Sequence, residues 1–212
     1  MGAKSDIFEN DAIDCFIRGQ AKPALPANWY VGLAVSSKGK HAVSTAYALN
    51  DTLFIEGDDN KWRLYKCTTA GTTAGTKPSY PGVNNEVITD GGVAQFTQQH
   101  AGMEDGSALV EPVGNGYARV AIPASLAAWA GTQGAGSTTA STGTSGTTSN
   151  NVAITFASPT GDWDWCGLFV LYDAITGGNH YISDSLSNPM NITNGMTNIE
   201  FAPGQLQYTE DD

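Results

Sequence analysis

The sequence predicts a mainly β protein, with an antiparallel β-sandwich or jelly-roll-like body, a short N-terminal α-helix and an inserted small β lobe. Three observations support this class. Short apolar segments follow one another at roughly ten-residue spacing, as in antiparallel β proteins. Gly, Pro, Asn and Asp clusters separate these segments, and one stretch alone has helical periodicity. The 212 residues are enough for one ample β body that carries a lobe.

The expected helix covers residues 6–18. Asp6 and Glu9 have the spacing of a capping box, and Gly19 is suited to end the helix. Apolar residues recur at the spacing of one helical face, namely Phe8, Ala12, Cys15 and Phe16. Such a helix either packs on a sheet or docks as an arm on a neighbouring subunit. For the second case we predict assembly contacts by Phe8, Phe16 and Ile17.

Residues 29–35 alternate large and small apolar side chains and predict the first core strand. The character of the sequence then changes over residues 36–110, where short apolar pieces alternate with turn clusters such as Gly57 to Asn60. This segment is expected to form the inserted β lobe. Residues 1–35 and 111–212 are expected to form the body.

The C-terminal half reads as a regular series of strands. Residues 166–172 form a continuous apolar run that suits a central strand. We expect separate short strands at 180–182 and 190–192, with a turn at Asn188 and Pro189 between them. Sixteen of the nineteen residues from Gly131 to Ser149 are Gly, Ser or Thr. That stretch is either a mobile loop or a segment ordered by assembly.

The charge is low and unevenly distributed. Charged residues make up 15% of the chain, and 10 basic residues face 21 acidic ones for a net charge of -11. All ten Lys and Arg residues lie at or before Arg119, whereas residues 120–212 contain eight acids and no base. This balance argues against nucleic acid or an anionic membrane surface as a partner.

Little in the sequence indicates catalysis or a cofactor. The three Cys and three His residues are scattered, so we expect no metal site, no cofactor and no disulfide framework. Asp162 and Asp164 could form a glycosidase pair, but turn acids beside core tryptophans explain them as well. We therefore expect no catalytic residue and no enzyme. The lack of an apolar signal segment or spanning run predicts a protein made in the cytoplasm without membrane insertion.

Several motifs follow one another in a specific order. They are an amphipathic helix at 5–19, Trp29 to Ala34, Gly116 to Arg119, Asn151 to Phe156, Gly167 to Asn179, Pro189 to Ile192, Asn194 and Gly195, and Phe201 to Leu206. This order resembles that of small virion proteins of tailed bacteriophages, such as tail fibre, collar and head-fibre proteins. Residues 63–72, 77–81 and 87–93 are similar to a small β repeat of phage tail and fibre proteins.

The resemblance implies an oligomeric structural subunit of the virion, in the neck, tail, baseplate or capsid, whose partners are copies of itself and other virion proteins. It carries over no catalytic residue. An alternative function is a carbohydrate-binding module that recognises host polysaccharide. Its sugar-stacking candidates are Trp62, Tyr65 and Tyr80 in the lobe, or Trp163 and Trp165 near a sheet edge. Exposed coplanar rings would favour sugar binding, and buried rings would favour a scaffold.

Overall fold

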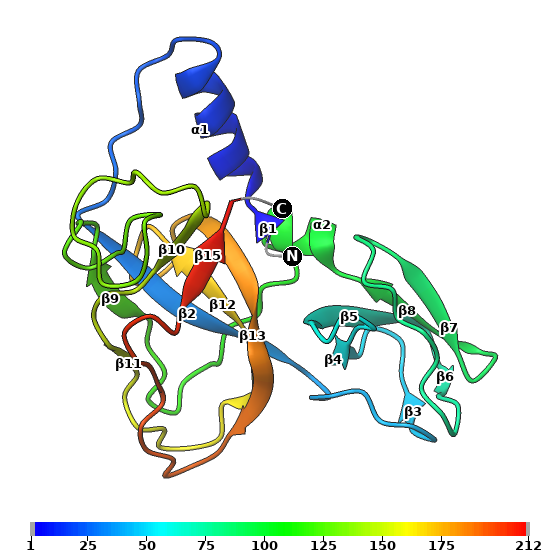
Figure 1. Cartoon of the computed structure of the whole chain (residues 1–212). Coiled ribbons are helices and arrows are strands. Elements are labelled where there is room, and N and C mark those ends of the chain that lie inside the picture. Colours follow the sequence, from blue (N-terminus) through cyan, green and yellow to red (C-terminus); the bar gives the residue numbers. More distant parts are fainter. Residues whose placement is uncertain (1–2, 211–212) are drawn as a thin grey trace.

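The computed structural model describes residues 3–210 and is mainly β (Figure 1). Two helices are present in this range, α1 (Asp6–Phe16) and α2 (His100–Glu104). The strands are β1 (Ala3–Lys4), β2 (Asn28–Ser36), β3 (Ala46–Tyr47), β4 (Thr52–Glu56), β5 (Trp62–Thr69), β6 (Gly71–Thr72), β7 (Val87–Asp90), β8 (Ala94–Gln98), β9 (Val120–Pro123), β10 (Thr147–Ser149), β11 (Ile154–Thr155), β12 (Asp164–Tyr172), β13 (His180–Ile192), β14 (Glu200–Phe201) and β15 (Gln207–Thr209). The named strands pair antiparallel. The predicted fold class, mainly β with a short N-terminal helix, is confirmed.

A five-stranded sheet with the order β1-β13-β12-β2-β9 forms the centre of the molecule. Strand β12 lies between β13 and β2, as its continuous apolar run predicted. Because successive side chains of a strand point to opposite faces, Phe169 and Leu171 join one apolar cluster, whereas Leu168 and Val170 join another. Both faces of the central strand are therefore buried.

Strand β13 corrects one expectation. The predicted turn at Asn188 and Pro189 lies inside a continuous 13-residue strand. The register of β13 against β12 shifts between the Cys166 and Leu168 pairs, and the proline falls in this irregular stretch. On its other side β13 pairs with β1 at Ile182 and Ser183, so within residues 3–210 no ladder partner requires a backbone N–H from the proline.

One face of the central sheet is covered by the C-terminal segments. The two-stranded sheets β10-β15 and β11-β14 come from these segments. Ile154, Phe156, Ile199 and Leu206 are buried there and pack in the cluster that contains Phe169. The amide of Asn150, which is fully buried, fixes this layer through four hydrogen bonds to backbone groups of Val152, Phe201, Ala202 and Leu206.

A four-stranded sheet, β4-β5-β8-β7, packs against the other face of β12. Its residues come from the stretch between β2 and β9, where the sequence predicts the inserted lobe. Phe54 and Leu64 pack against Leu168 and Val170, and the ring of Phe54 lies directly over the backbone of Gly167. Leu53, Ile55 and Tyr65 face a third cluster within the stretch. The domain boundaries at residues 35 and 110 stay a prediction.

The start of helix α1 differs by one residue from the expected capping box at Asp6. Ser5 is the N-cap, and its hydroxyl accepts a hydrogen bond from the Phe8 N–H at 3.1 Å. The helix ends at Phe16, two residues earlier than predicted, and Gly19 beyond it has a left-handed φ of 66°. Strand β1 precedes the cap and ties the helix to the edge of β13.

Candidate assembly surface

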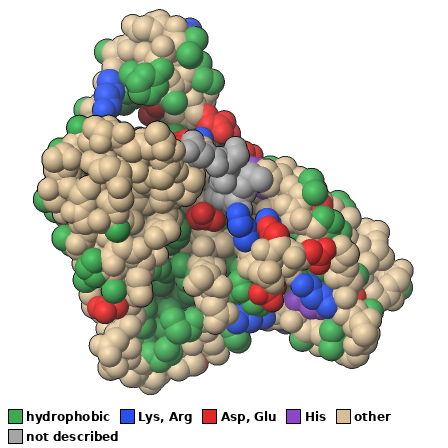
Figure 2. All heavy atoms as spheres, viewed as in Figure 1, with side chains coloured by type: hydrophobic (Ala, Val, Ile, Leu, Met, Phe, Trp, Pro, Cys, Tyr) green, Lys and Arg blue, Asp and Glu red, His purple; other side chains and the backbone are tan. Residues whose placement is uncertain are grey.

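Helix α1 projects from the body and presents apolar side chains to solvent (Figures 1 and 2). None of its residues is fully buried. Ile13, Phe16 and Ile17 are 51%, 81% and 80% exposed. Their i, i+3, i+4 spacing places them on one side of the helix and its C-cap. We call these three residues the helix-tip patch.

The predicted assembly contacts have different surroundings. Phe8 is half-buried, whereas Phe16 and Ile17 are exposed. Ile13 was not among the predicted contacts, because it lies off the helical face formed by Phe8, Ala12 and Cys15. The i, i+4 pair of Ile13 and Ile17 was the signal that could have revealed the second apolar face. Contact of Phe8, Phe16 and Ile17 with a partner stays a prediction.

The charged residues beside the helix-tip patch neutralise each other. Arg18 donates a hydrogen bond from its guanidinium to the Asp14 carboxylate at 2.7 Å, an i, i+4 pair. Glu9 and Asp6 lie on the same side as the patch but one to two turns nearer the N-terminus. At that end of a helix, negative side chains interact favourably with the helix dipole. The exposed end of the helix is therefore apolar without an unpaired charge.

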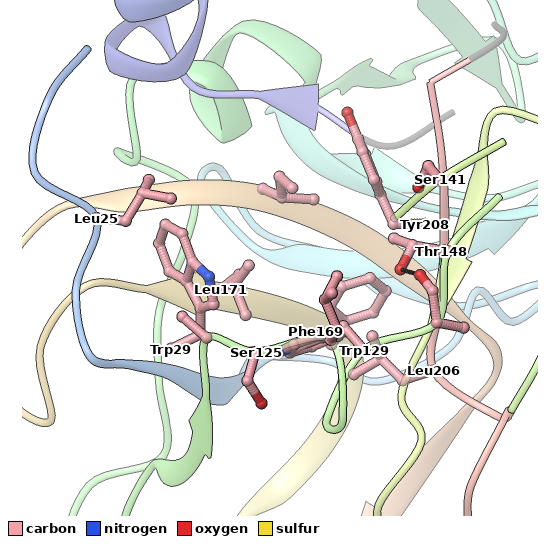
Figure 3. A pocket seen from close by; sticks show the side chains of 15 residues that line it. Leu25, Trp29, Ser125, Trp129, Ser141, Thr148, Phe169, Leu171, Leu206 and Tyr208 are labelled. Carbon is pink, nitrogen blue, oxygen red and sulfur yellow. Dashed lines mark hydrogen bonds between the residues drawn. The ribbon is translucent and has the colours of Figure 1, made fainter. Parts of the chain in front are cut away.

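An apolar pocket of about 490 Å³ opens on the body (Figure 3). We define this aromatic pocket by Leu25, Trp29, Leu126, Trp129, Leu206 and Tyr208, which lie on its walls. Phe169 and Leu171 of β12 also line it, so it lies on the sheet face covered by the C-terminal segments. Its volume falls in the range of about 300–1,000 Å³ that is usual for ligand pockets.

One residue that lines the pocket carries a buried donor without a hydrogen-bond partner. The indole Nε1 of Trp129 is buried and has no hydrogen-bond partner among the described residues. Buried donors of this kind are rare in folded proteins, because each one loses its bond to water without a replacement. Neighbouring side chains seal this nitrogen from solvent, so it does not open onto the surface of the pocket.

The Gly/Ser/Thr-rich segment 131–149 forms part of the pocket wall. Gly131, Ser141 and Thr148 line the cavity. The segment is held by local hydrogen bonds, including those from the Gln133 amide to Thr139 and Ala140. No residue between positions 120 and 161 is charged. This part of the pocket rim therefore has no charge that a docking partner would have to desolvate.

Two of the sugar-stacking candidates lie in the core. Tyr65 and Tyr80 are fully buried, and their rings contact each other edge to face at 5.4 Å. Tyr65 donates its hydroxyl hydrogen to Glu86, and Tyr80 donates to Asp90 at 3.2 Å. Core packing thus removes both rings as candidates for sugar stacking, and the expectation is corrected for these two residues.

Trp62 is half-buried at the wall of a second cavity of about 810 Å³. Lys40 Nζ lies 4.7 Å from the centre of its ring, so a cation covers one face of the indole. Asn60, Ser187, Gln205 and other polar side chains line the same cavity. The other pair of candidate indoles is divided, since Trp163 is buried in the core and Trp165 is half-buried.

The motif from Gly116 to Arg119 has a structural role. Tyr117 donates its hydroxyl hydrogen to Glu111 Oε1 at 2.6 Å and accepts a hydrogen bond from the Leu33 N–H at 2.8 Å. Arg119 binds both oxygens of Glu111 and stacks on the ring of Tyr172 at 3.3 Å. Burial, together with the Glu111 carboxylate, raises the pKa of Tyr117 far above its ordinary value and that of Tyr172 to about 12.

The other titratable candidates also serve the fold. Asp162 Oδ1 accepts a hydrogen bond from the Asn194 N–H at 2.8 Å. Burial, with a smaller contribution from Asp164, raises the pKa of the Cys166 thiol to about 12. Over residues 3–210, no group of three or more His, Cys, Asp or Glu side chains is arranged to hold a metal ion. The same range contains no helix that is long and apolar enough to span a membrane.

An exposed apolar patch such as the helix end marks a site of interaction with other molecules. The family described as Podophage GP4 fiber I protein gp80 matches residues 93–209, which is more than half of the chain. The chain therefore belongs to this family of phage fibre proteins. It is a structural component of the virion and not an enzyme, as the motif order predicted. No curated protein matches the chain.

Proposed function

We propose that this fibre protein is an oligomeric appendage subunit that assembles through the helix-tip patch. The observation that carries the proposal is the exposure of Phe16 and Ile17 at the end of a projecting helix. Burying a large apolar side chain contributes about 1.5–3 kcal/mol, so leaving two of them in water is costly for a monomer. A contact that covers both recovers this free energy.

The mass of the purified chain in solution tests the proposal. Light scattering after gel filtration is expected to show an oligomer at micromolar concentration. The double variant Phe16→Ser, Ile17→Ser is expected to shift it toward the monomer, whereas the control Ile175→Ser changes a 54% exposed isoleucine outside α1 and leaves the mass unchanged. A wild-type monomer that is also absent from the purified virion would overturn the proposal.

A second candidate function is glycan binding at the cavity beside Trp62. The observation that favours it is a half-buried indole on a wall that also carries amide and hydroxyl side chains, a combination that suits sugar rings. Titration of host polysaccharide against the chain and its Trp62→Ala variant tests this function. If the wild type does not bind polysaccharide at millimolar concentration, glycan binding is ruled out. If the wild type binds and the Trp62→Ala variant does not, glycan binding is supported.

A further inference from the structure

The helix-tip patch and the aromatic pocket are matched in chemistry although they lie on different parts of the chain. The patch offers three apolar side chains that protrude into solvent. The pocket offers an apolar cavity of about 490 Å³, with room for large side chains such as Phe16 and Ile17. In the single chain the patch is not buried and the pocket is not filled, and a contact between the two would do both.

The anchoring of α1 keeps its tip out of the pocket of the same chain. Strand β1 pairs with β13 at Ser183 and Ile182, and the Ser5 N–H donates to the Tyr181 carbonyl at 2.9 Å. The helix begins at the next residue and rises about 1.5 Å per residue. Its eleven residues carry the tip roughly 16 Å beyond this anchor, and Figure 1 shows α1 standing away from the body.

Charge also favours contact between these two surfaces. The pocket wall between positions 120 and 161 contains no charged residue, and the Asp14 and Arg18 charges beside the patch are paired with each other. Docking therefore leaves no ion uncompensated in an apolar contact, which would be expensive. An acidic peptide or a basic partner would find no complementary charge on this wall.

We propose that the helix-tip patch of one copy occupies the aromatic pocket of a second copy. The inference rests on the proposed function, because it names the partner of the assembly helix. Because the patch and the pocket are different surfaces, each copy can donate its patch to one neighbour and accept the patch of another, so the contact can repeat from copy to copy. Such contacts generate a closed ring or an open filament, depending on the rotation between neighbours.

Two single-surface variants test the contact. Phe16→Asp disables the patch, and Leu126→Asp places a charge at the rim of the pocket, where the leucine is 53% exposed. Leu49→Asp is the matched control, since Leu49 is 59% exposed and lies outside the pocket. Each of the first two variants alone is expected to be monomeric by light scattering, and the control is expected to match the wild type.

Mixing the variants gives the decisive result. The intact patch of Leu126→Asp fits the intact pocket of Phe16→Asp, so an equimolar mixture is expected to form a dimer that neither variant forms alone. If Phe16→Asp disrupts assembly but Leu126→Asp does not, and no mixed dimer forms, the inference is wrong while the proposed function stands. If the wild type is a monomer and is also missing from the virion, both the inference and the proposed function are wrong.

A disulfide trap provides a second readout that does not depend on loss of assembly. In a Cys15→Ser background, the Ile17→Cys and Leu126→Cys chains are mixed and oxidised. Because each chain carries one engineered thiol, and Cys67 and Cys166 are buried, a disulfide between the two kinds of chain reports contact between copies. Cross-linking at the level of a control with Leu49→Cys in place of Leu126→Cys would overturn the inference.

Discussion

Substituting Gly167 by alanine tests how the central sheet and the four-stranded sheet are joined. A Cβ atom at this position would lie no more than 2.6 Å from three atoms of the Phe54 ring. Ordinary carbon contacts are about 3.5–4.0 Å, so the overlap is about 1 Å. The backbone φ of Gly167 is not left-handed, and the cost therefore comes from contact alone. We expect Gly167→Ala to lower the free energy of unfolding by about 1–3 kcal/mol.

A double-mutant cycle with Phe54 separates this contact from other causes. Phe54 is fully buried, so Phe54→Ala alone is expected to cost about 3–5 kcal/mol. In that background the alanine at 167 meets a cavity instead of a ring. The loss of unfolding free energy in the double variant is then expected to be smaller than the sum of the two single losses, by at least about 1 kcal/mol.

Urea unfolding followed by circular dichroism and tryptophan fluorescence measures the four proteins of the cycle. Gly75→Ala is the control, because a Cβ there meets only Ser44 Oγ at 3.8 Å and the φ is not left-handed. It is expected to change stability by less than about 0.5 kcal/mol or to increase it slightly. A Gly167→Ala variant as stable as this control, or strict additivity in the cycle, would refute the packing argument.

The remaining predictions concern three polar groups and the assembly contact. Tyr117→Phe leaves the Leu33 N–H without its partner and is expected to cost about 1–3 kcal/mol in urea unfolding; no change would contradict this role. Asn150→Ala removes four hydrogen bonds in a buried site and is expected to cost about 3 kcal/mol or more, measured in the same way. Hydrogen bonds from Arg63 hold the pKa of Asp59 well below its ordinary value, so the ionised form stabilises the fold above the unfolded pKa of about 4 and this stability is lost as pH falls. Asp59→Asn is therefore expected to cost about 1 kcal/mol near neutral pH, and a loss that does not shrink below pH ~4 would contradict the linkage. Finally, an apolar contact between copies is expected to persist at high sodium chloride and to strengthen in sulfate, and dissociation of the oligomer by salt would indicate a charged interface instead.

Strand β12 shows what could be predicted from the sequence. A run of apolar residues from Cys166 to Tyr172 has to be buried on both faces, and the centre of a sheet provides that burial. The strand after it could not be predicted in the same way. Pro189 is a turn signal in isolation, and it is accommodated in the stretch where the register of β13 against β12 shifts. Local chemistry did not reveal this long-range arrangement.

The candidate site was partly predictable for a similar reason. The periodicity of residues 6–18 predicted the helix, and Phe16 and Ile17 were expected to be contacts. Which face of α1 turns to solvent depends on the two-residue pairing of β1 with β13, which has no clear signal in the sequence. The aromatic pocket had no signal at all. Trp29, Trp129 and Tyr208 are far apart in the chain and meet only when the C-terminal segments cover the sheet.

The two faces of the central sheet also determine how assembly and the lobe can coexist. Side chains of β12 alternate between the faces, so Phe169 lines the aromatic pocket while Leu168 packs in the cluster with Phe54. A copy docked in the pocket would therefore contact the face opposite the four-stranded sheet and would not have to displace it. Under this arrangement the segment that carries most of the basic residues stays outside the contact between copies. Repetition of the subunit would then present many copies of the lobe while the bodies form the continuous scaffold.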